Sequence, residues 1–229
     1  MVKYLRLKIL SDDDVDVCHN FAMTTEHIPF AEAAQLLSNV DSDWHRVIQH
    51  VGVCTLKPTS YTEPYEALVR AVAYQQLSTK AGDAIFAKFK TRFDGNIPNP
   101  TTLVDATFDD LRACGFSGRK VETLQGIAQA ALSGVVPTRT LADEMSNDAL
   151  IEQLVTLKGI GQWTVEMMLI FTLRRLDVLP VDDLGVREGY KRLKSLPEAP
   201  KPKVLAEIGL AWQPYRTVAS WYLWRVPKG

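Results

Sequence analysis

The chain has 229 residues, of which 46% are hydrophobic and 23% charged, and its formal net charge is −1. These proportions are typical of a globular protein and exclude an intrinsically disordered chain. The longest apolar run, MMLIFTL at residues 167–173, is far shorter than the roughly 20 residues of a membrane-spanning helix, so we expect no transmembrane segment.

The first 30 residues have neither the apolar core nor the cleavage site of a secretory signal, and contain one weak strand candidate at residues 4–10. The three cysteines form no C-x-x-C pair, and the four histidines lack metal-binding spacing. We therefore expect an intracellular protein without a redox cofactor, cytoplasmic if bacterial and nuclear if eukaryotic.

Beyond residue 30, apolar residues recur at helical spacing and strand alternation is nearly absent, which predicts an all-α fold. Expected N-caps are Thr62, Thr79, Ser117 and Asn147, and Gly52, Gly95 and Gly134 are expected stops. The predicted helices span residues 30–39, 42–51, 64–77, 80–93, 118–133, 147–157, 162–174, 184–195, 202–211 and 215–224.

Two of these helices are joined by a glycine-rich turn in the stretch LVTLKGIGQWT, residues 154–164. A turn of this kind commonly serves only to end one helix and begin another. It also exposes backbone amides at a helix N-terminus, which is a suitable place for a nucleic-acid phosphate. The basic balance from Lys158 onward, 12 Lys and Arg against 7 Asp and Glu, is compatible with either interpretation.

A pair of aspartates follows about twenty residues later in LPVDDLGVR, residues 179–187. Asp182 or Asp183 could cap the helix that begins there. A fixed carboxylate could also stabilise positive charge that develops in a transition state. Both roles are compatible with one position.

The chain resembles the helix-hairpin-helix superfamily of base-excision DNA glycosylases in two strings. They are Leu154-x-x-Leu157-Lys158-Gly-Ile-Gly-x-Trp163-Thr and, after it, Pro180-x-x-Asp183-Leu-Gly. The QQLSTKA segment at residues 75–81 and the W-x-P-Y-R segment at 212–216 resemble the alkylation-repair branch, the 3-methyladenine DNA glycosylase II type. The similarity extends over residues 60–226. It implies two helical lobes around a central cleft, with the helix-hairpin-helix motif at 147–174.

The resemblance implies that Asp183 is the catalytic residue, with Asp182 as the alternative. Members that also cut the DNA strand carry a lysine two residues after the second hairpin glycine, where it forms a Schiff base with the sugar. This chain has Trp163 there, and Lys158 lies outside that register. The resemblance therefore implies a monofunctional enzyme in which water attacks the sugar.

Other site residues also follow from motif register. The base pocket is assigned to Trp163, Trp224 and Met167, although an aromatic residue on an amphipathic helix is more often part of the core. DNA contacts are assigned to Gln75, Gln76, Leu77, Lys158, Gly159, Ile160 and Gly161. The backbone carbonyls of Val155, Leu157 and Ile160 are candidate ligands of a structural Na⁺ or K⁺ ion.

The sequence thus predicts a segment of uncertain structure at residues 1–30 and a helical glycosylase domain at 31–229. The expected function is hydrolysis of the N-glycosidic bond of 3-methyladenine and related alkylpurines in duplex DNA, by a monomer with no membrane partner. Two alternatives stay open: a non-catalytic helix-hairpin-helix DNA-binding protein, and a glycosylase for oxidised or mismatched bases.

Overall fold

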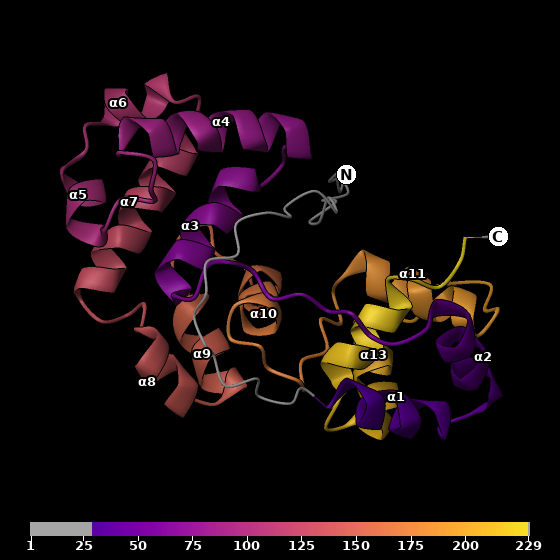
Figure 1. Ribbon diagram of the computed structural model, residues 1–229. Coiled ribbons are helices and arrows are strands. Elements are labelled where there is room, and N and C mark those ends of the chain that lie inside the picture. Colours follow the sequence, from indigo (N-terminus) through magenta and orange to yellow (C-terminus); the bar gives the residue numbers. More distant parts are fainter. Residues whose placement is uncertain (1–28, 229) are drawn as a thin grey trace, which may run out of the picture. The chain divides into compact units, whose positions relative to one another are not determined.

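The computed structural model describes residues 29–228 (Figure 1), so the candidate strand at residues 4–10 lies outside the described part. Within residues 29–228 every regular element is a helix, which confirms the predicted all-α class. None of the helices in this range is long and apolar enough to cross a membrane.

The helices follow one another along the chain with short connections. They are α1 (Phe30–Ser38), α2 (Ser42–Val51), α3 (Pro64–Tyr74), α4 (Thr79–Arg92), α5 (Pro100–Asp105), α6 (Phe108–Ala113), α7 (Gly118–Leu132), α8 (Arg139–Glu144), α9 (Asn147–Leu154), α10 (Gln162–Phe171), α11 (Leu184–Leu193), α12 (Pro202–Ile208), the 3₁₀ helix η1 (Gly209–Trp212) and α13 (Arg216–Leu223).

All ten predicted helices are present, but several end earlier than the apolar pattern indicates. Helices α3, α9 and α10 each end three residues before the predicted bound, and α3 ends at Tyr74 rather than at residue 77. The chain leaves the helix because Gln75 is extended, with ψ 133°, and Gln76 is left-handed, with φ 58°. Gln75, Gln76 and Leu77 therefore form a loop and not the last turn of a helix.

The expected N-caps are only partly confirmed. The Ser117 side chain accepts a hydrogen bond from the Lys120 amide, as predicted. The predicted caps at Thr79 and Asn147 are wrong, because the hydroxyls of the preceding residues, Ser78 and Ser146, accept the bonds instead. The prediction for Thr62 is also wrong, because α3 begins after Glu63 without a side-chain cap.

Three helices of six residues each, α5, α6 and α8, are absent from the sequence prediction. A helix of fewer than two turns is too short to display a hydrophobic period. The sequence signals that could have located α5 and α6 are their N-cap residues. The Asn99 side chain caps α5, and the Thr107 side chain caps α6.

The chain folds into two compact units. Unit 1 contains the described segments Glu63–Glu144 and Glu152–Ile160, and unit 2 contains residues 29–62, Met145–Ile151 and residues 161–228. The predicted cleft between two lobes stays a prediction. The predicted domain boundary after residue 30 also stays a prediction.

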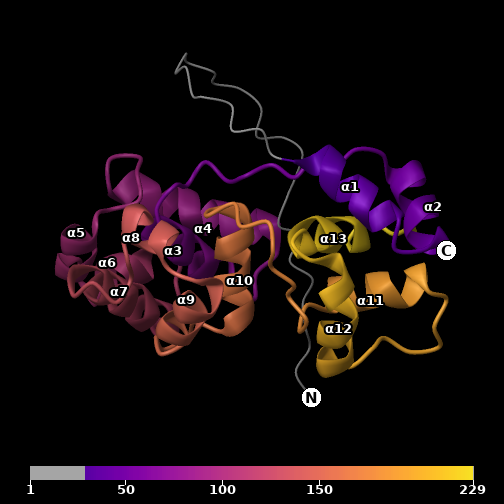
Figure 2. The ribbon, with the colours of Figure 1, turned by 90° about the horizontal axis from the view of Figure 1, so that it is seen from below.

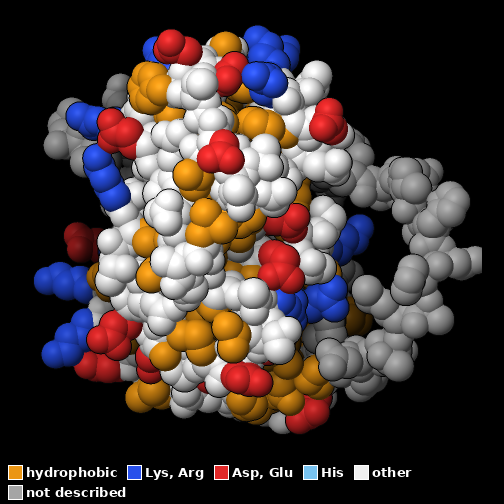
Figure 3. Space-filling model, turned by 90° about the vertical axis from the view of Figure 1, so that its left-hand side faces the viewer, with side chains coloured by type: hydrophobic (Ala, Val, Ile, Leu, Met, Phe, Trp, Pro, Cys, Tyr) orange, Lys and Arg blue, Asp and Glu red, His pale blue; other side chains and the backbone are white. Residues whose placement is uncertain are grey.

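Unit 1 is built around α7, which packs against α3, α5 and α6. Its core contains a cluster of phenylalanines in which Phe89 contacts Phe86, Phe93 and Phe116 at ring-centroid distances of 5.3 to 6.0 Å. On the face that carries α5, α6 and α8, acidic, basic and hydrophobic side chains are intermingled (Figure 3). Neither sign of charge dominates that face, so it does not have the basic character of a DNA-binding surface.

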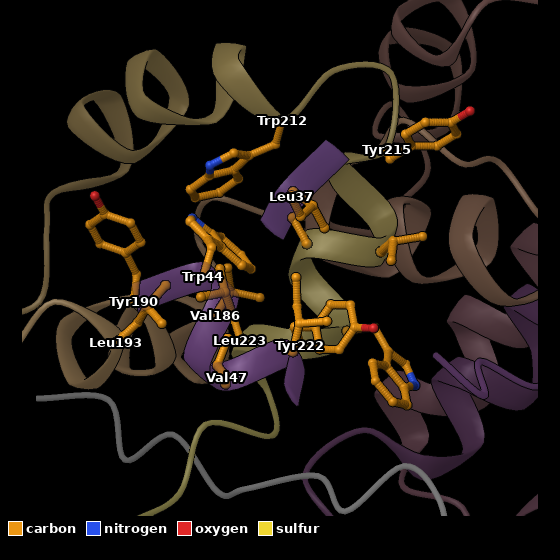
Figure 4. Packing of buried hydrophobic residues seen from close by; sticks show 14 of the residues in the cluster. Leu37, Trp44, Val47, Val186, Tyr190, Leu193, Trp212, Tyr215, Tyr222 and Leu223 are labelled. Carbon is orange, nitrogen blue, oxygen red and sulfur yellow. The ribbon is translucent and has the colours of Figure 1, made fainter. Parts of the chain in front are cut away.

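Unit 2 packs α1, α2, α11 and α13 around an apolar cluster (Figure 2). Trp44, Tyr190 and Trp212 lie close together in this cluster (Figure 4), and the Trp44 and Trp212 rings meet edge-on at 5.2 Å. Helix α10 also belongs to unit 2, and its residues 164–171 are all buried. A helix that is buried on every side is a rigid support for the side chains at its exposed end.

Candidate active site

Asp183 is the N-cap of α11, and both of its carboxylate oxygens accept hydrogen bonds within unit 2. Its Oδ1 accepts from the Val186 amide at 2.7 Å and from the indole Nε1 of Trp224 at 2.9 Å. Its Oδ2 accepts from the indole Nε1 of Trp163 at 2.8 Å. The capping role considered from the sequence is thus confirmed, and the same contacts fix the orientation of the carboxylate.

Two glycines of α11 allow Trp224 to reach Asp183. A Cβ atom on Gly189 would lie 2.0 Å from the carbonyl oxygen of Leu223, so only glycine permits this approach of α13. A Cβ atom on Gly185 would lie 2.9 Å from the Trp224 ring and 3.0 Å from the Asp183 carboxylate. The glycine of the Asp-Leu-Gly motif is therefore required by the contact between the indole and the carboxylate.

The two indoles come from different helices and are both half-buried. Trp163 lies in the first turn of α10, and Trp224 follows the last residue of α13. Phe171, at the end of α10, stacks on Trp224 with ring centroids 6.1 Å apart and planes inclined by 17°. The Trp224 ring is thereby held at its N–H and on one face, and part of its surface stays accessible.

Glu166 is a buried acid one turn after Trp163, and no motif in the sequence singles it out. Its side chain is 3% exposed, its Oε1 accepts from Gln162 Nε2 at 2.9 Å, and its Oε2 has no partner. Burial and the nearby carboxylates of Asp182 and Asp183 raise the pKa of Glu166 to about 7, although the bond from Gln162 opposes the shift.

We expect Glu166→Gln to stabilise the protein above pH 7. Unfolded Glu166 loses its proton near pH 4.5 and folded Glu166 near pH 7, so wild type loses stability between these values. The amide keeps the shape without this titration, and the difference should reach on the order of 3 kcal/mol at pH 8. Urea unfolding at pH 4.5 and pH 8 measures the difference in free energy of unfolding between the variant and wild type. The exposed Glu207→Gln variant is the control. An equal difference at both pH values would contradict the raised pKa of Glu166.

The hairpin turn begins after α9, which ends at Leu154. The chain turns at Gly159, whose φ is +86°, and a Cβ atom there would lie 2.7 Å from the Thr123 hydroxyl on α7. Gly161 is different: it is extended, with φ −101°, and a Cβ atom on it would meet nothing within 4 Å. It is the N-cap of α10, and no side chain of residues 29–228 caps that helix, which leaves its first amides without a side-chain partner in this part of the chain.

The other predicted DNA contacts are in unit 1. The Lys158 ammonium forms a salt bridge with Glu122 at 2.8 Å, and both side chains are exposed. Gln75 donates from Nε2 to the carbonyl oxygen of Gly159 at 3.1 Å, and Gln76 is exposed. The loop after α3 and the hairpin turn are therefore in direct contact.

The structure thus brings together Asp183, Trp163 and Trp224, and separately the Gln75 loop and the Gly159 turn. Met167 is buried in α10, and its place in a base pocket stays a prediction. Sequence reasoning missed the roles of Gly185 and Gly189, for which their spacing of four on α11 was the available signal.

A sequence profile of HhH-GPD superfamily base excision DNA repair proteins matches residues 69–214. The DNA-3-methyladenine glycosylase 1 of Schizosaccharomyces pombe is 46% identical over 196 residues, which cover 84% of this chain and 85% of that protein. The solved structure of the S. pombe 3-methyladenine DNA glycosylase with abasic DNA superposes with a TM-score of 0.75, covering 85% of this chain and 95% of the other. A DNA-3-methyladenine glycosidase from Bacillus halodurans, 34% identical, gives 0.77 with 84% and 88% covered.

Proposed function

We propose, from the premise that this chain belongs to the HhH-GPD superfamily of base excision DNA repair proteins, that it is a DNA-3-methyladenine glycosylase. It hydrolyses the N-glycosidic bond of alkylated bases in DNA. The observation that carries the proposal is the carboxylate of Asp183, which three N–H donors from α10, α11 and the end of α13 hold in place.

The chemistry requires a fixed anion beside the deoxyribose. Breaking the N-glycosidic bond generates an oxocarbenium-like sugar, and a carboxylate that is already oriented stabilises this cation without reorganising. Among residues 29–228, Asp183 accepts hydrogen bonds only from N–H groups of neutral residues, so no cation of this part of the chain is paired with its negative charge. Asp183 would then stabilise the sugar cation and orient the attacking water.

The indoles of Trp163 and Trp224 would form walls for the displaced base, with Met167 behind them on α10. An alkylated purine carries positive charge, and an aromatic face attracts such a cation by roughly 0.5 to 2 kcal/mol beyond its buried area. Their N–H groups are engaged by Asp183, so the rings present their faces rather than their polar edges. Such a pocket selects for charge and flatness, which alkylated purines share.

Double-stranded DNA would be held by the hairpin and the loop after α3. The open amides at Gly161 and the beginning of α10 suit a phosphate, while Gln76 and Leu77, in the loop that begins at Gln75, suit the space left by a displaced nucleotide. Val155, Leu157 and Ile160 follow the end of α9, where carbonyls lose their helical partners, and such oxygens suit Na⁺ or K⁺. An ion bound there would add positive charge next to the phosphate.

The proposal is tested by incubating the protein with methylated duplex DNA and identifying the released bases. We expect release of 3-methyladenine from duplex DNA. Tight duplex binding without base release would favour the non-catalytic DNA-binding alternative. Release of oxidised or mismatched bases instead of alkylated ones would favour the other alternative.

We also expect the enzyme to be monofunctional. Trp163 occupies the position of the lysine nucleophile, so water attacks the sugar and leaves an abasic site in an intact strand. With borohydride present, base release should proceed without a covalent protein–DNA adduct, and nicks should appear only after alkali, which serves as the positive control. A borohydride-dependent adduct that disappears in Lys158→Ala would show that Lys158 reaches the sugar.

A further inference from the structure

The first turns of α7 support both segments of unit 1 to which the proposed function assigns DNA contacts. One segment is the loop after α3, and the other is the turn from Lys158 to Ile160. Both contacts lie within unit 1, where Ala73 and Thr123 are buried and Lys120 is half-buried.

Lys120 fixes the point at which the loop leaves α3. Its ammonium donates to the carbonyl oxygen of Ala73 at 2.8 Å, and Ala73 is fully buried in the last turn of α3. Carbonyls at a helix C-terminus lack helical partners and carry the negative end of the helix dipole, so a cation is favourable there. Burial lowers the pKa of Lys120 to about 8, which leaves the side chain mainly protonated at pH 7.

Gln75 joins the loop to the hairpin turn. Its backbone is extended, and its side-chain nitrogen Nε2 donates to the Gly159 carbonyl oxygen at 3.1 Å. The next residue, Gln76, is left-handed and exposed. The two adjacent glutamines therefore have different environments: one side chain contacts the protein and the other is accessible to a ligand.

The turn from Lys158 to Ile160 also packs against α7. Gly159 packs so closely on Thr123 that a Cβ atom would approach the threonine hydroxyl to 2.7 Å. The Thr123 hydroxyl donates to the carbonyl oxygen of Arg119, which fixes its own orientation. The exposed ion pair of Lys158 with Glu122 adds little to this arrangement.

We propose that Gln75 and Lys120 are positioning residues that hold the loop and the hairpin turn in one fixed geometry. The inference rests on the proposed function. With a phosphate bound at Gly161, directly after the turn, Gln76 and Leu77 would then lie opposite the nucleotide that must leave the stack. Lysine and glutamine act here through the protein backbone rather than through contact with DNA.

The test compares two variants that keep the side-chain length but remove the donor, Gln75→Met and Lys120→Met. Gln129→Met, which alters an exposed glutamine on the same helix, is the control. Single-turnover release of an alkylated purine is measured from two duplexes, one with a normal partner base and one with an abasic analogue opposite the lesion. A 2-aminopurine beside the lesion reports unstacking, and undamaged duplex gives the salt dependence of binding.

On the paired duplex we expect each variant to release base about tenfold more slowly than wild type, as expected for one lost hydrogen bond. When the lesion lies opposite the abasic analogue, it has no base pair to break, so the reduction in release rate should shrink to about twofold. Undamaged duplex should bind with unchanged salt dependence, because neither residue contacts phosphate. Lys120→Arg should recover most of the rate.

Three results would overturn the inference. The rate of base release could fall equally on both duplexes, or on neither. Binding of Lys120→Met to undamaged duplex could also depend less on salt, which would make Lys120 a phosphate contact. The function and the inference can fail separately. If wild type releases no base but gives a 2-aminopurine signal that the variants lose, the glycosylase function is rejected and the positioning role of Gln75 and Lys120 is kept. Normal release with unchanged signals in both variants would reject only the inference.

Discussion

Asp183→Asn should reduce base release by at least about a thousandfold, because it removes the charge that stabilises the sugar cation. The change also affects the local contacts. One carboxylate oxygen accepts from Trp163 and the other from Trp224 and Val186. An amide has only one acceptor oxygen, so its NH₂ group must face at least one N–H donor.

The effect of lost charge can be separated from the effect of this donor conflict. Trp163→Phe removes the opposing N–H, so the double variant Asp183→Asn/Trp163→Phe should regain thermal stability without regaining activity. Duplex binding should survive in both, because phosphate contacts are made elsewhere. Single-turnover base release, melting temperature and duplex affinity are measured together.

The neighbouring carboxylate provides the matched control. Asp182 is exposed, and we expect Asp182→Asn to retain base release within a few-fold of wild type. Near-normal release by Asp183→Asn, or loss of release only in Asp182→Asn, would transfer the catalytic role to Asp182.

Motif register was sufficient to select Asp183, Trp163 and Trp224 from the sequence, but it could not give their geometry. The hydrogen bonds from the indoles connect residues 20 and 41 positions apart, and the bond from Trp224 depends on how closely α13 approaches α11. That approach is set by Gly189 against the backbone of Leu223. A helical glycine without a known neighbour gives no such information.

The fold shows the same limit at the end of α3. Apolar periodicity continues through Tyr74 to Leu77, so local sequence favours more helix than is formed. The structure places Lys120 on the carbonyl of Ala73 and Gln75 on the carbonyl of Gly159, partners that lie 47 and 84 residues away. These long-range bonds accompany the end of the helix at Tyr74, and neither is visible from local propensity.

The hairpin glycines also look equivalent in sequence and differ in structure. Gly159 has a positive φ and packs on Thr123, so any side chain there strains the backbone and displaces α7. Gly161 is extended, which a β-branched residue tolerates well, and space is free around its Cβ position. Only Gly161 can therefore be enlarged without disturbing the fold.

Replacing Gly161 in turn by Ala, Val and Ile should weaken duplex binding progressively, by about a hundredfold for Ile, since blocking amide–phosphate bonds costs about 1.5 to 3 kcal/mol each. The added side chain would occupy the space in front of the first amides of α10, where the phosphate would bind. Melting temperatures should stay close to wild type, whereas Gly159→Ala should lower them. Because phosphates carry no base information, affinity for damaged and undamaged duplex should fall in parallel, with a smaller salt dependence. If only lesion-containing DNA lost affinity, Gly161 would belong to the base pocket and the phosphate would have to bind elsewhere.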